Sequence, residues 1–243
     1  MSNIIQTLWI GKHLSVMERL SLKSFVDNDM EIHLYCYGEI DNVPEGVVIK
    51  DGNDILPKED IFAYKVGPGK GSYSAFSNFF RYKLLNLKGG WWVDTDMVCL
   101  SKWDFDEEYV FIAEEEYGTG KSVVNSGAIK APKGCEIMEW AYQECLKHDR
   151  EKLQWGTVGP KLLGEAVDKF KLNKYIRERQ EFCIIAPFRS NLFTVEMKEM
   201  NFPEQVVGLH LWNEAWRRLG LDKHATYHHN SIYERLKRKH KVV

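Results

Sequence analysis

The order of apolar and polar positions along the chain predicts an α/β fold. Short apolar runs that end in glycine are typical of buried strands. Such runs occur at 4–11, 31–38 and 46–52. After the first run, Ser15 and Glu18 form the S-x-x-E pattern of a helix capping box, and spaced apolar positions carry a helix toward Asp27. Strand, helix and strand at this spacing predict a parallel sheet with right-handed crossovers.

A second helix is predicted after a glycine-rich link at 66–74. The segment 73–88, YSAFSNFFRYKLLNLK, has a helical period, and the two glycines that follow it stop the helix. The next strand covers 91–94, so Asp94 and Asp96 fall at its carboxyl end, which is where open α/β sheets bind ligands. The same patterns predict strands near 109–113 and 123–130, helices near 134–148 and 157–170, and a mixed segment that ends at 206–212.

Composition narrows the class of protein. The apolar content of 44% suits a well-filled core, and no linker or repeat divides the chain, so we expect one domain over 1–243. A formal net charge of −2 provides no basic field, and no nucleic-acid partner is expected. The five cysteines are odd in number and widely spaced, unlike a disulfide framework. With no leader pattern and no apolar run of roughly 20 residues, we expect a cytoplasmic protein.

Asp94 and Asp96 are the first candidates for chemistry. Residues i and i+2 of an extended chain point to the same side, so these carboxylates could hold Mg²⁺ or Mn²⁺ and leave room for substrate phosphates. A D-x-D triplet is also common in solvated turns, and that is the alternative interpretation. The buried strand before the triplet and the lack of an adjacent basic residue in the sequence favour the metal.

Asn78 and Arg81 are the next candidates, on the helix that feeds this strand. They lie three positions apart and therefore share a helix face. Arg81 could be an ordinary surface charge, but its planar fork of donors also suits phosphate or sugar hydroxyls.

The segment 74–98, SAFSNFFRYKLLNLKGGWWVDTDMV, resembles the core of the family 32 glycosyltransferases and their relatives among the clostridial glucosylating toxins and α-1,4-glycosyltransferases. That core has a serine and an arginine on a helix, two glycines and then D-x-D. The matching residues are Ser77, Arg81, Gly89, Gly90, Asp94 and Asp96. Asn78 departs from the family, which has an aspartate that contacts donor ribose or sugar hydroxyls, and Trp92 replaces a tyrosine.

Four other segments are similar to family motifs, in the same order along the chain. They are 4–11 with Trp9 near its end, 125–134 beginning with Asn125, 156–163 (GTVGPKLL), and 210–216 (HLWNEAW) with His210 and Trp212. Each also has a purely structural interpretation. Trp9 could be a core residue, Asn125 a turn residue, Pro160 a helix start, and His210 a hydrogen-bonded core histidine.

The resemblance implies a GT-A-like, Rossmann-type nucleotide-sugar-binding domain with a mixed central sheet. It implies a Mn²⁺- or Mg²⁺-dependent transfer of a hexose from a UDP-sugar to a saccharide or lipid-linked acceptor, with retention, in surface polysaccharide synthesis. Asp94, Asp96 and Arg81 would be catalytic, and His210 would join the two aspartates as a metal ligand. The donor-binding residues would be Trp9, Ser77, Asn78, Arg81, Asp94, Asn125 and Trp212. The alternatives are a sugar nucleotidyltransferase and a non-catalytic nucleotide-sugar-binding protein.

The C-terminal tail, 231–243, is basic and has its own predicted helix. Ser231 and Glu234 form another capping-box pattern, and five lysines and arginines follow. Most such charge runs are simply solvated. The tail could also rest on an anionic membrane, with an apolar side made of Ile232, Tyr233, Leu236 and Val243.

Overall fold

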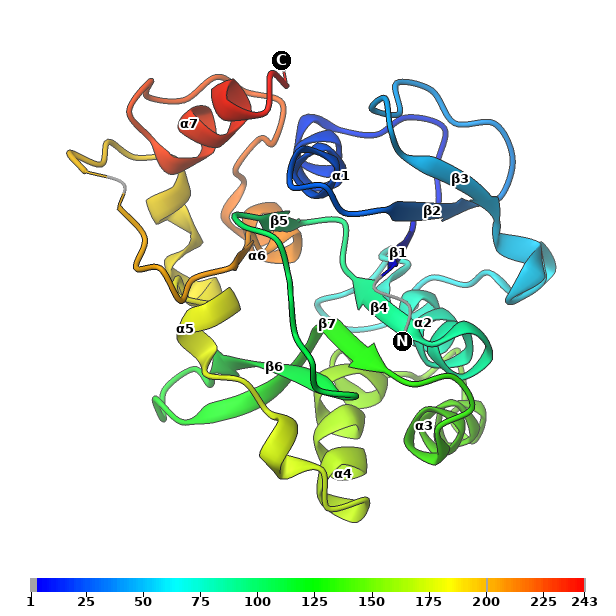
Figure 1. The fold of residues 1–243 in the computed structure, drawn as a ribbon. Coiled ribbons are helices and arrows are strands. Elements are labelled where there is room, and N and C mark those ends of the chain that lie inside the picture. Colours follow the sequence, from blue (N-terminus) through cyan, green and yellow to red (C-terminus); the bar gives the residue numbers. More distant parts are fainter. Residues whose placement is uncertain (1–3, 200, 243) are drawn as a thin grey trace.

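The computed structural model describes residues 4–199 and 201–242 as a mixed α/β structure (Figure 1). Its central sheet has six strands in the order β3-β2-β1-β4-β7-β6. The strands are β1 (Ile5–Leu8), β2 (Ile32–Cys36), β3 (Val48–Asp51), β4 (Gly90–Val93), β6 (Val110–Glu115) and β7 (Ser122–Ala131). The first four pair in parallel, whereas β7 runs antiparallel to both β4 and β6. The predicted α/β class with a mixed sheet is confirmed.

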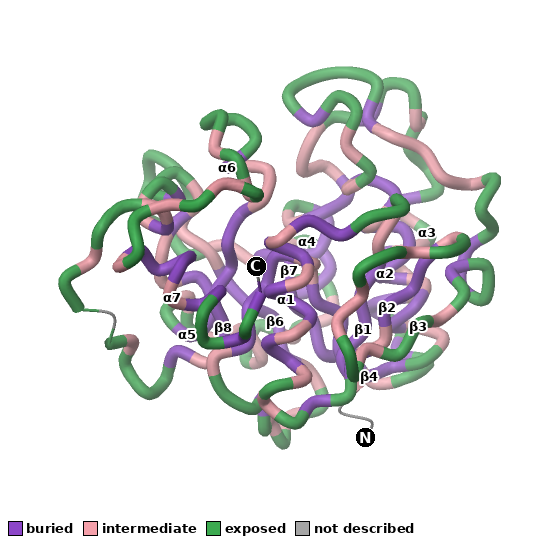
Figure 2. The backbone as a smooth tube through the Cα atoms, turned by 90° about the horizontal axis from the view of Figure 1, so that it is seen from above, coloured by how far each residue is buried: buried purple, intermediate pink, exposed green. Residues whose placement is uncertain are grey.

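Helices cover both faces of this sheet and create two hydrophobic cores. Helices α2 (Ser74–Lys88), α3 (Glu136–Leu146) and α4 (Leu162–Lys169) pack on one face. Helices α1 (Val16–Asp27), α5 (Arg179–Phe182), α6 (Asn213–Leu219) and α7 (Ile232–Lys239) contribute to the core on the other. Figure 2 shows the central strands buried and the outer loops exposed, and the edge strand β3 is largely exposed. This is the layered arrangement that a parallel α/β pattern predicts.

Most predicted elements are found, and their end signals act as the sequence suggested. Ser15 and Glu18 make a complete capping box at α1, in which each side chain bonds a backbone N–H of the first turn. α2 stops at Gly89, whose φ of 68° lies in the region that favours glycine. Ser231 caps α7 by accepting from the backbone of Glu234, whose own carboxylate instead accepts from Tyr227 and Lys237.

The helix predicted over 157–170 is wrong in its first part. Thr157–Lys161 forms a single irregular turn of π type, with Gly159 outside helical geometry, and the regular helix begins only at Leu162. Pro160 explains the break, because its ring disfavours helical geometry at the preceding residue and it lacks a backbone N–H.

A small second sheet, which the sequence did not predict, joins two distant parts of the chain. β5 (Met97–Cys99) pairs antiparallel with β8 (Gly208–His210), and Met97 lies opposite His210. β5 begins directly after the D-x-D segment in the chain. The pairing therefore places the C-terminal motif beside the two aspartates.

The C-terminal tail folds back onto the molecule. Ile232, Tyr233 and Leu236 are buried in the core, and Val243 lies outside the described residues. In Figure 1 the chain end lies close to α1, and His240 Nδ1 lies 2.8 Å from Oδ2 of Asp27 at the end of that helix. The described part of the tail's apolar side thus packs on protein, and its exposed basic groups are what it could present to an anionic membrane.

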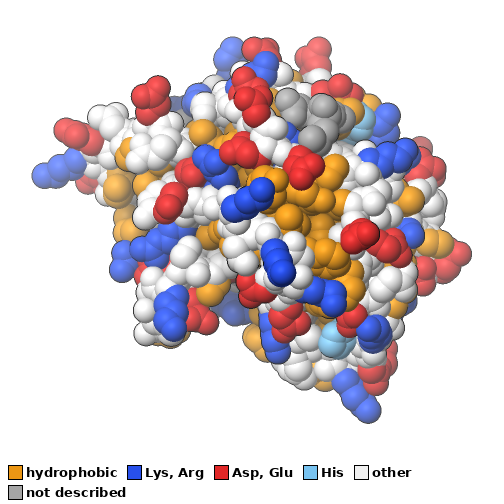
Figure 3. Space-filling view, turned by 60° about the horizontal axis from the view of Figure 1, so that its bottom comes forward, with side chains coloured by type: hydrophobic (Ala, Val, Ile, Leu, Met, Phe, Trp, Pro, Cys, Tyr) orange, Lys and Arg blue, Asp and Glu red, His pale blue; other side chains and the backbone are white. Residues whose placement is uncertain are grey.

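The surface carries both signs of charge. On the face shown in Figure 3, lysine, arginine and acidic side chains are interspersed around a patch of hydrophobic ones. Among the described residues no helix is long and apolar enough to cross a bilayer.

Candidate active site

A cleft of about 1040 Å³ opens at the carboxyl ends of β1 and β4. All nine residues that the sequence singled out line this cleft: Trp9, Ser77, Asn78, Arg81, Asp94, Asp96, Asn125, His210 and Trp212. They come from segments more than 200 positions apart in the chain. The fold therefore brings together what the sequence offered as separate motifs.

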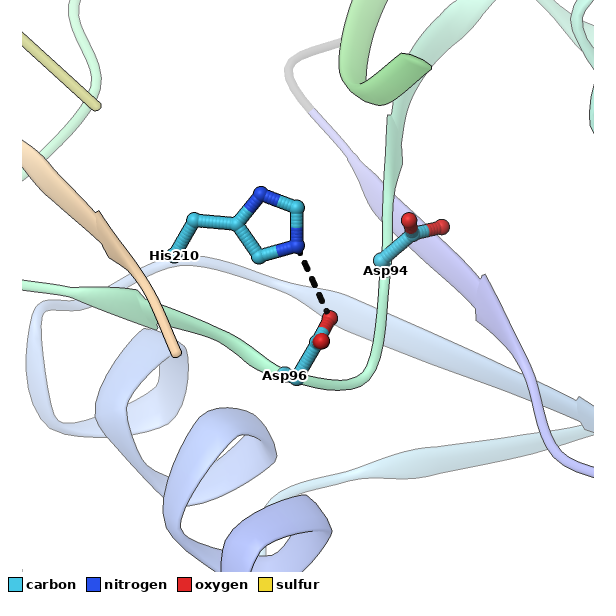
Figure 4. Close-up of side chains that lie close together, drawn as sticks. All are labelled: Asp94, Asp96 and His210. Atoms are coloured by element: carbon cyan, nitrogen blue, oxygen red, sulfur yellow. Dashed lines mark ion pairs between the residues drawn. The ribbon is translucent and has the colours of Figure 1, made fainter. Parts of the chain in front are cut away.

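Asp94, Asp96 and His210 form a group that could hold a metal ion. One ligand atom from each lies within 4.8 Å of the others. Figure 4 shows Asp96 and His210 pointing toward each other, with Asp94 beside them at the end of β4. Two carboxylates and an imidazole make a mixed oxygen and nitrogen donor set, which suits Mn²⁺ better than Mg²⁺.

Asp96 is nearly fully buried and has specific partners for both oxygens. Oδ1 lies 3.3 Å from Nε2 of His210, and Oδ2 accepts from the backbone N–H of Asn213 at 2.7 Å. That N–H is the first of α6, so Asp96 caps a helix that lies far from it in sequence. Burial favours the neutral acid, but the charge and hydrogen bond of His210 outweigh it and lower the pKa of Asp96.

His210 is held by its neighbours in an orientation that suits a ligand. Its ring stacks on Trp212 with centroids 3.8 Å apart, and Trp212 itself is fixed by a 2.7 Å hydrogen bond from Nε1 to the carbonyl of Ile185. Burial opposes a charge on the ring, yet the nearby Asp96 carboxylate raises the pKa of His210 well above its usual value. A metal ion at Nε2 would take the place of that proton.

Asp94 makes its hydrogen bonds with other residues than Asp96 does. Arg81, which is 3% exposed, donates to Oδ1 of Asp94 at 2.9 Å, and the indole N–H of Trp92 donates to the same oxygen at 2.9 Å. Arg81 also bonds the carbonyl of Ser126 and, at 3.3 Å, the hydroxyl of Ser77. Burial raises the pKa of Asp94, and the Arg81 charge acts against that rise.

The sequence therefore missed two features of Asp94. It indicated no basic partner for the acidic pair, but Arg81 supplies one from the preceding helix. It showed Trp92 only as a replacement for tyrosine, although the indole N–H is one of the groups that fix Asp94. Spacing along a helix and a strand cannot reveal which side chains meet across them.

Asn78 lies against the 156–163 segment, which is similar to one of the family motifs. A Cβ at Gly159 would lie only 3.1 Å from Nδ2 of Asn78, so the two segments touch closely. Asn78 is 6% exposed, and its Oδ1 has no hydrogen-bond partner among the described residues. A buried amide oxygen without a partner is costly, which makes a ligand hydroxyl a suitable occupant.

Asn125 lies inside β7, where the register between β6 and β7 shifts. Its Oδ1 accepts from the backbone of Gly127 at 2.6 Å, and a Cβ at Gly127 would lie 2.8 Å from Cε1 of His210. Glu114 is another residue of the cleft. Burial raises the pKa of Glu114, while Asn125 and the charge of His210 act against that rise. No pattern in the sequence marked Glu114, which stands in a run of three glutamates.

Trp9 is partly buried and lines the cleft at the end of β1. Its indole N–H donates to the carbonyl of His13 at 3.1 Å, and the ammonium of Lys223 lies 5.7 Å from the ring centroid. A fixed, half-buried ring at this place can act as a platform for a planar group.

Comparison with known proteins identifies the fold. Searches with protein-family models and against curated proteins find no match. Among solved structures, the PaToxG glycosyltransferase is similar with a TM-score of 0.51 and 15% identity, over 99% of this chain and 85% of that chain. The apo-form glycosyltransferase GlyE of Streptococcus pneumoniae TIGR4 is similar with a TM-score of 0.50 and 13% identity, over 100% of this chain and 64% of that one. The chain therefore has a glycosyltransferase fold of the GT-A type, and its place in family 32 stays a prediction.

Proposed function

We propose that the protein is a metal-dependent glycosyltransferase that moves a hexose from a UDP-sugar to a saccharide or lipid-linked acceptor. The observation that supports this most is the Asp94, Asp96 and His210 group inside the cleft of a glycosyltransferase fold. Transfer with retention, action as a single domain and a role in surface polysaccharide synthesis are part of the proposal, and they rest on the resemblance of the motifs.

In this proposal each cleft residue has a task. Asp96 and His210 hold the metal ion together with Asp94, and the ion supplies Lewis-acid stabilisation of the leaving diphosphate. Arg81 fixes the Asp94 carboxylate and balances its charge. Asn78 offers its unpartnered amide oxygen to a donor hydroxyl.

The outer residues of the cleft complete the donor site. Trp9 stacks on the base, and Trp212 keeps the ring of His210 in place. Asn125 holds the β7 backbone at Gly127 next to His210, and Ser77 supports Arg81 through its hydroxyl.

Two other functions are compatible with the fold. A sugar nucleotidyltransferase would need a glycine-rich loop with an arginine after β1, and residues 9–18, WIGKHLSVME, contain neither. A non-catalytic sugar-binding protein could keep the fold, but it would have no need of the intact metal-ligand group.

The decisive experiment is a screen of UDP-sugars for release of UDP by the purified protein. We expect one UDP-hexose to be hydrolysed slowly in the presence of Mn²⁺, and we expect EDTA to abolish the release. ADP-glucose and GDP-mannose serve as controls for the base. Absence of release from every UDP-sugar, with the fold verified by circular dichroism, would reject the enzyme and favour the binding protein.

A further inference from the structure

The cleft residues follow one another across the sheet in the order of its strands. Trp9 follows β1, Asp94 follows β4, Asn125 lies on β7 and Glu114 on β6, and these four strands are consecutive in the sheet. Neighbouring strands lie about 4.8 Å apart, so β1 and β6 are separated by about 14 Å. A donor with its base at Trp9 and its diphosphate at Asp94 would place its sugar near β7. The β6 end of the cleft then lies beyond the donor.

An exposed aromatic pair stands at this β6 end. Tyr117, just after β6, is 78% exposed, and Phe188 is 36% exposed. Their ring centroids lie 5.2 Å apart with an interplanar angle of 72°, and both residues line the cleft. Large aromatic side chains that are exposed in a cleft normally contact a ligand, because their exposure to water does not stabilise the folded protein.

Glu114 adds a hydrogen-bond acceptor at the same end of the cleft. It lies on β6, three residues before Tyr117, and lines the cleft together with the aromatic pair. Its neighbour Glu115 is instead paired with Arg179 at 2.7 Å. A sugar ring has an apolar C–H face and an edge of hydroxyl donors. An aromatic face and a carboxyl in the same part of a cleft match both parts, whereas a lipid chain would make no use of the carboxyl.

We propose that Tyr117, Phe188 and Glu114 form an acceptor subsite that binds a sugar ring, by contact of its C–H face with the aromatic pair and by a hydroxyl bonded to Glu114. The inference rests on the proposed function and narrows it. The group that receives the hexose is a saccharide, free or at the end of a longer carrier.

Binding of oligosaccharides tests this subsite. The protein with UDP and Mg²⁺ is applied to a glycan array, and the best oligosaccharide is titrated against four proteins by saturation-transfer NMR. They are the wild type, Tyr117→Ala, Tyr117→Phe and Glu116→Gln. We expect Tyr117→Ala to weaken binding roughly tenfold (about 1.4 kcal/mol), with Tyr117→Phe within about twofold of wild type. Glu116→Gln, an exposed neighbour outside the cleft, should change nothing.

Measurement of the affinity for UDP distinguishes a failure of the acceptor subsite from a failure of the proposed glycosyltransferase function. All four proteins should bind UDP equally, since Tyr117 lies at the far end from Trp9. Normal UDP binding with no oligosaccharide bound, or with equal oligosaccharide binding by wild type and Tyr117→Ala, would overturn the acceptor subsite alone. A wild-type protein that binds neither UDP nor a saccharide would overturn the proposed function and this inference together.

Discussion

At the scale of single residues, Asp94 and Asp96 have different partners although only one residue separates them. Asp94 is bound by the guanidinium of Arg81 and the indole of Trp92, whereas Asp96 is bound by His210 and a helix N–H. One aspartate is thus balanced by a fixed positive charge, and the other by an imidazole that a metal ion can share. The two carboxylates are not interchangeable.

Replacement of Asp96 by asparagine should therefore separate metal binding from folding. Asparagine keeps an oxygen that can accept from Asn213 but loses the charge that pairs with the buried His210, so we expect a loss of about 1–3 kcal/mol in the free energy of unfolding. The affinity for UDP with Mn²⁺ should fall by more than roughly tenfold, since even groups behind a metal ligand contribute about 10- to 100-fold. Urea unfolding and calorimetry measure the two quantities.

Glu116→Gln is the matched control for this change, because it removes one carboxylate outside the cleft. It should leave both quantities at the wild-type value. Unchanged UDP affinity in Asp96→Asn would mean that Asp96 is only a helix cap.

The sequence predicted nine of the residues that line the cleft, because each stands in a short local motif with a known chemistry, and the roles of these residues stay predictions. It could not predict the pairing of Arg81 with Asp94, since side-chain contacts between a helix and a strand depend on packing. It also missed Glu114 and the aromatic pair, because a glutamate in an acidic run and a tyrosine in a turn have no distinctive pattern.

At the scale of elements, the site depends on short pieces that local patterns describe poorly. β5 and β8 have three residues each, and their pairing fixes His210 next to Asp96. Strands this short carry almost no period-two signal. The helices α1 and α2 were predicted well because caps and glycine stops are local and strong.

The role of the break before α4 can be tested by replacing two glycines, one in the break and one inside α4. Gly159→Ala would place a Cβ 3.1 Å from the amide of Asn78, so we expect Asn78 to shift and UDP-sugar binding to weaken by roughly tenfold or less (up to about 1.4 kcal/mol). Gly164, inside α4, has open space around its Cβ position. Gly164→Ala should therefore keep binding and raise the free energy of unfolding by up to about 1 kcal/mol.

Calorimetry with the donor and urea unfolding distinguish these two variants. Weaker binding by Gly164→Ala, or wild-type binding by Gly159→Ala, would contradict the proposed contact between the broken turn and the donor site.

At the scale of the whole molecule, the sheet with its two covered faces provides a rigid support for the cleft. The residues of the cleft come from both ends of the chain, and the 74–98 and 206–219 segments meet only through long-range packing. The fold class followed from the order of elements. The closeness of the motifs in space could not be predicted from the sequence, because no local feature of the sequence encodes it.

Binding of UDP should stabilise the entire structure, and only in the presence of a divalent cation. Without a cation, Asp94 and Asp96 repel a diphosphate, whereas a bound ion reverses the sign of that interaction. UDP at 100 times its dissociation constant adds about 2.7 kcal/mol to the free energy of unfolding. For a chain of this size, that raises the melting temperature by roughly 5–10 °C.

Differential scanning calorimetry with Mn²⁺ and UDP, with EDTA and UDP, and with Mn²⁺ alone measures this stabilisation. The first sample should melt highest, and Asp96→Asn should lose most of the difference because its ion is held more weakly. An equal shift in EDTA would mean that UDP binds without a metal, and Asp94 and Asp96 would then have to act by hydrogen bonding alone. An ion that stabilises the protein equally with and without UDP would instead indicate a structural metal, which holds β4 against β8 and takes no part in binding the donor.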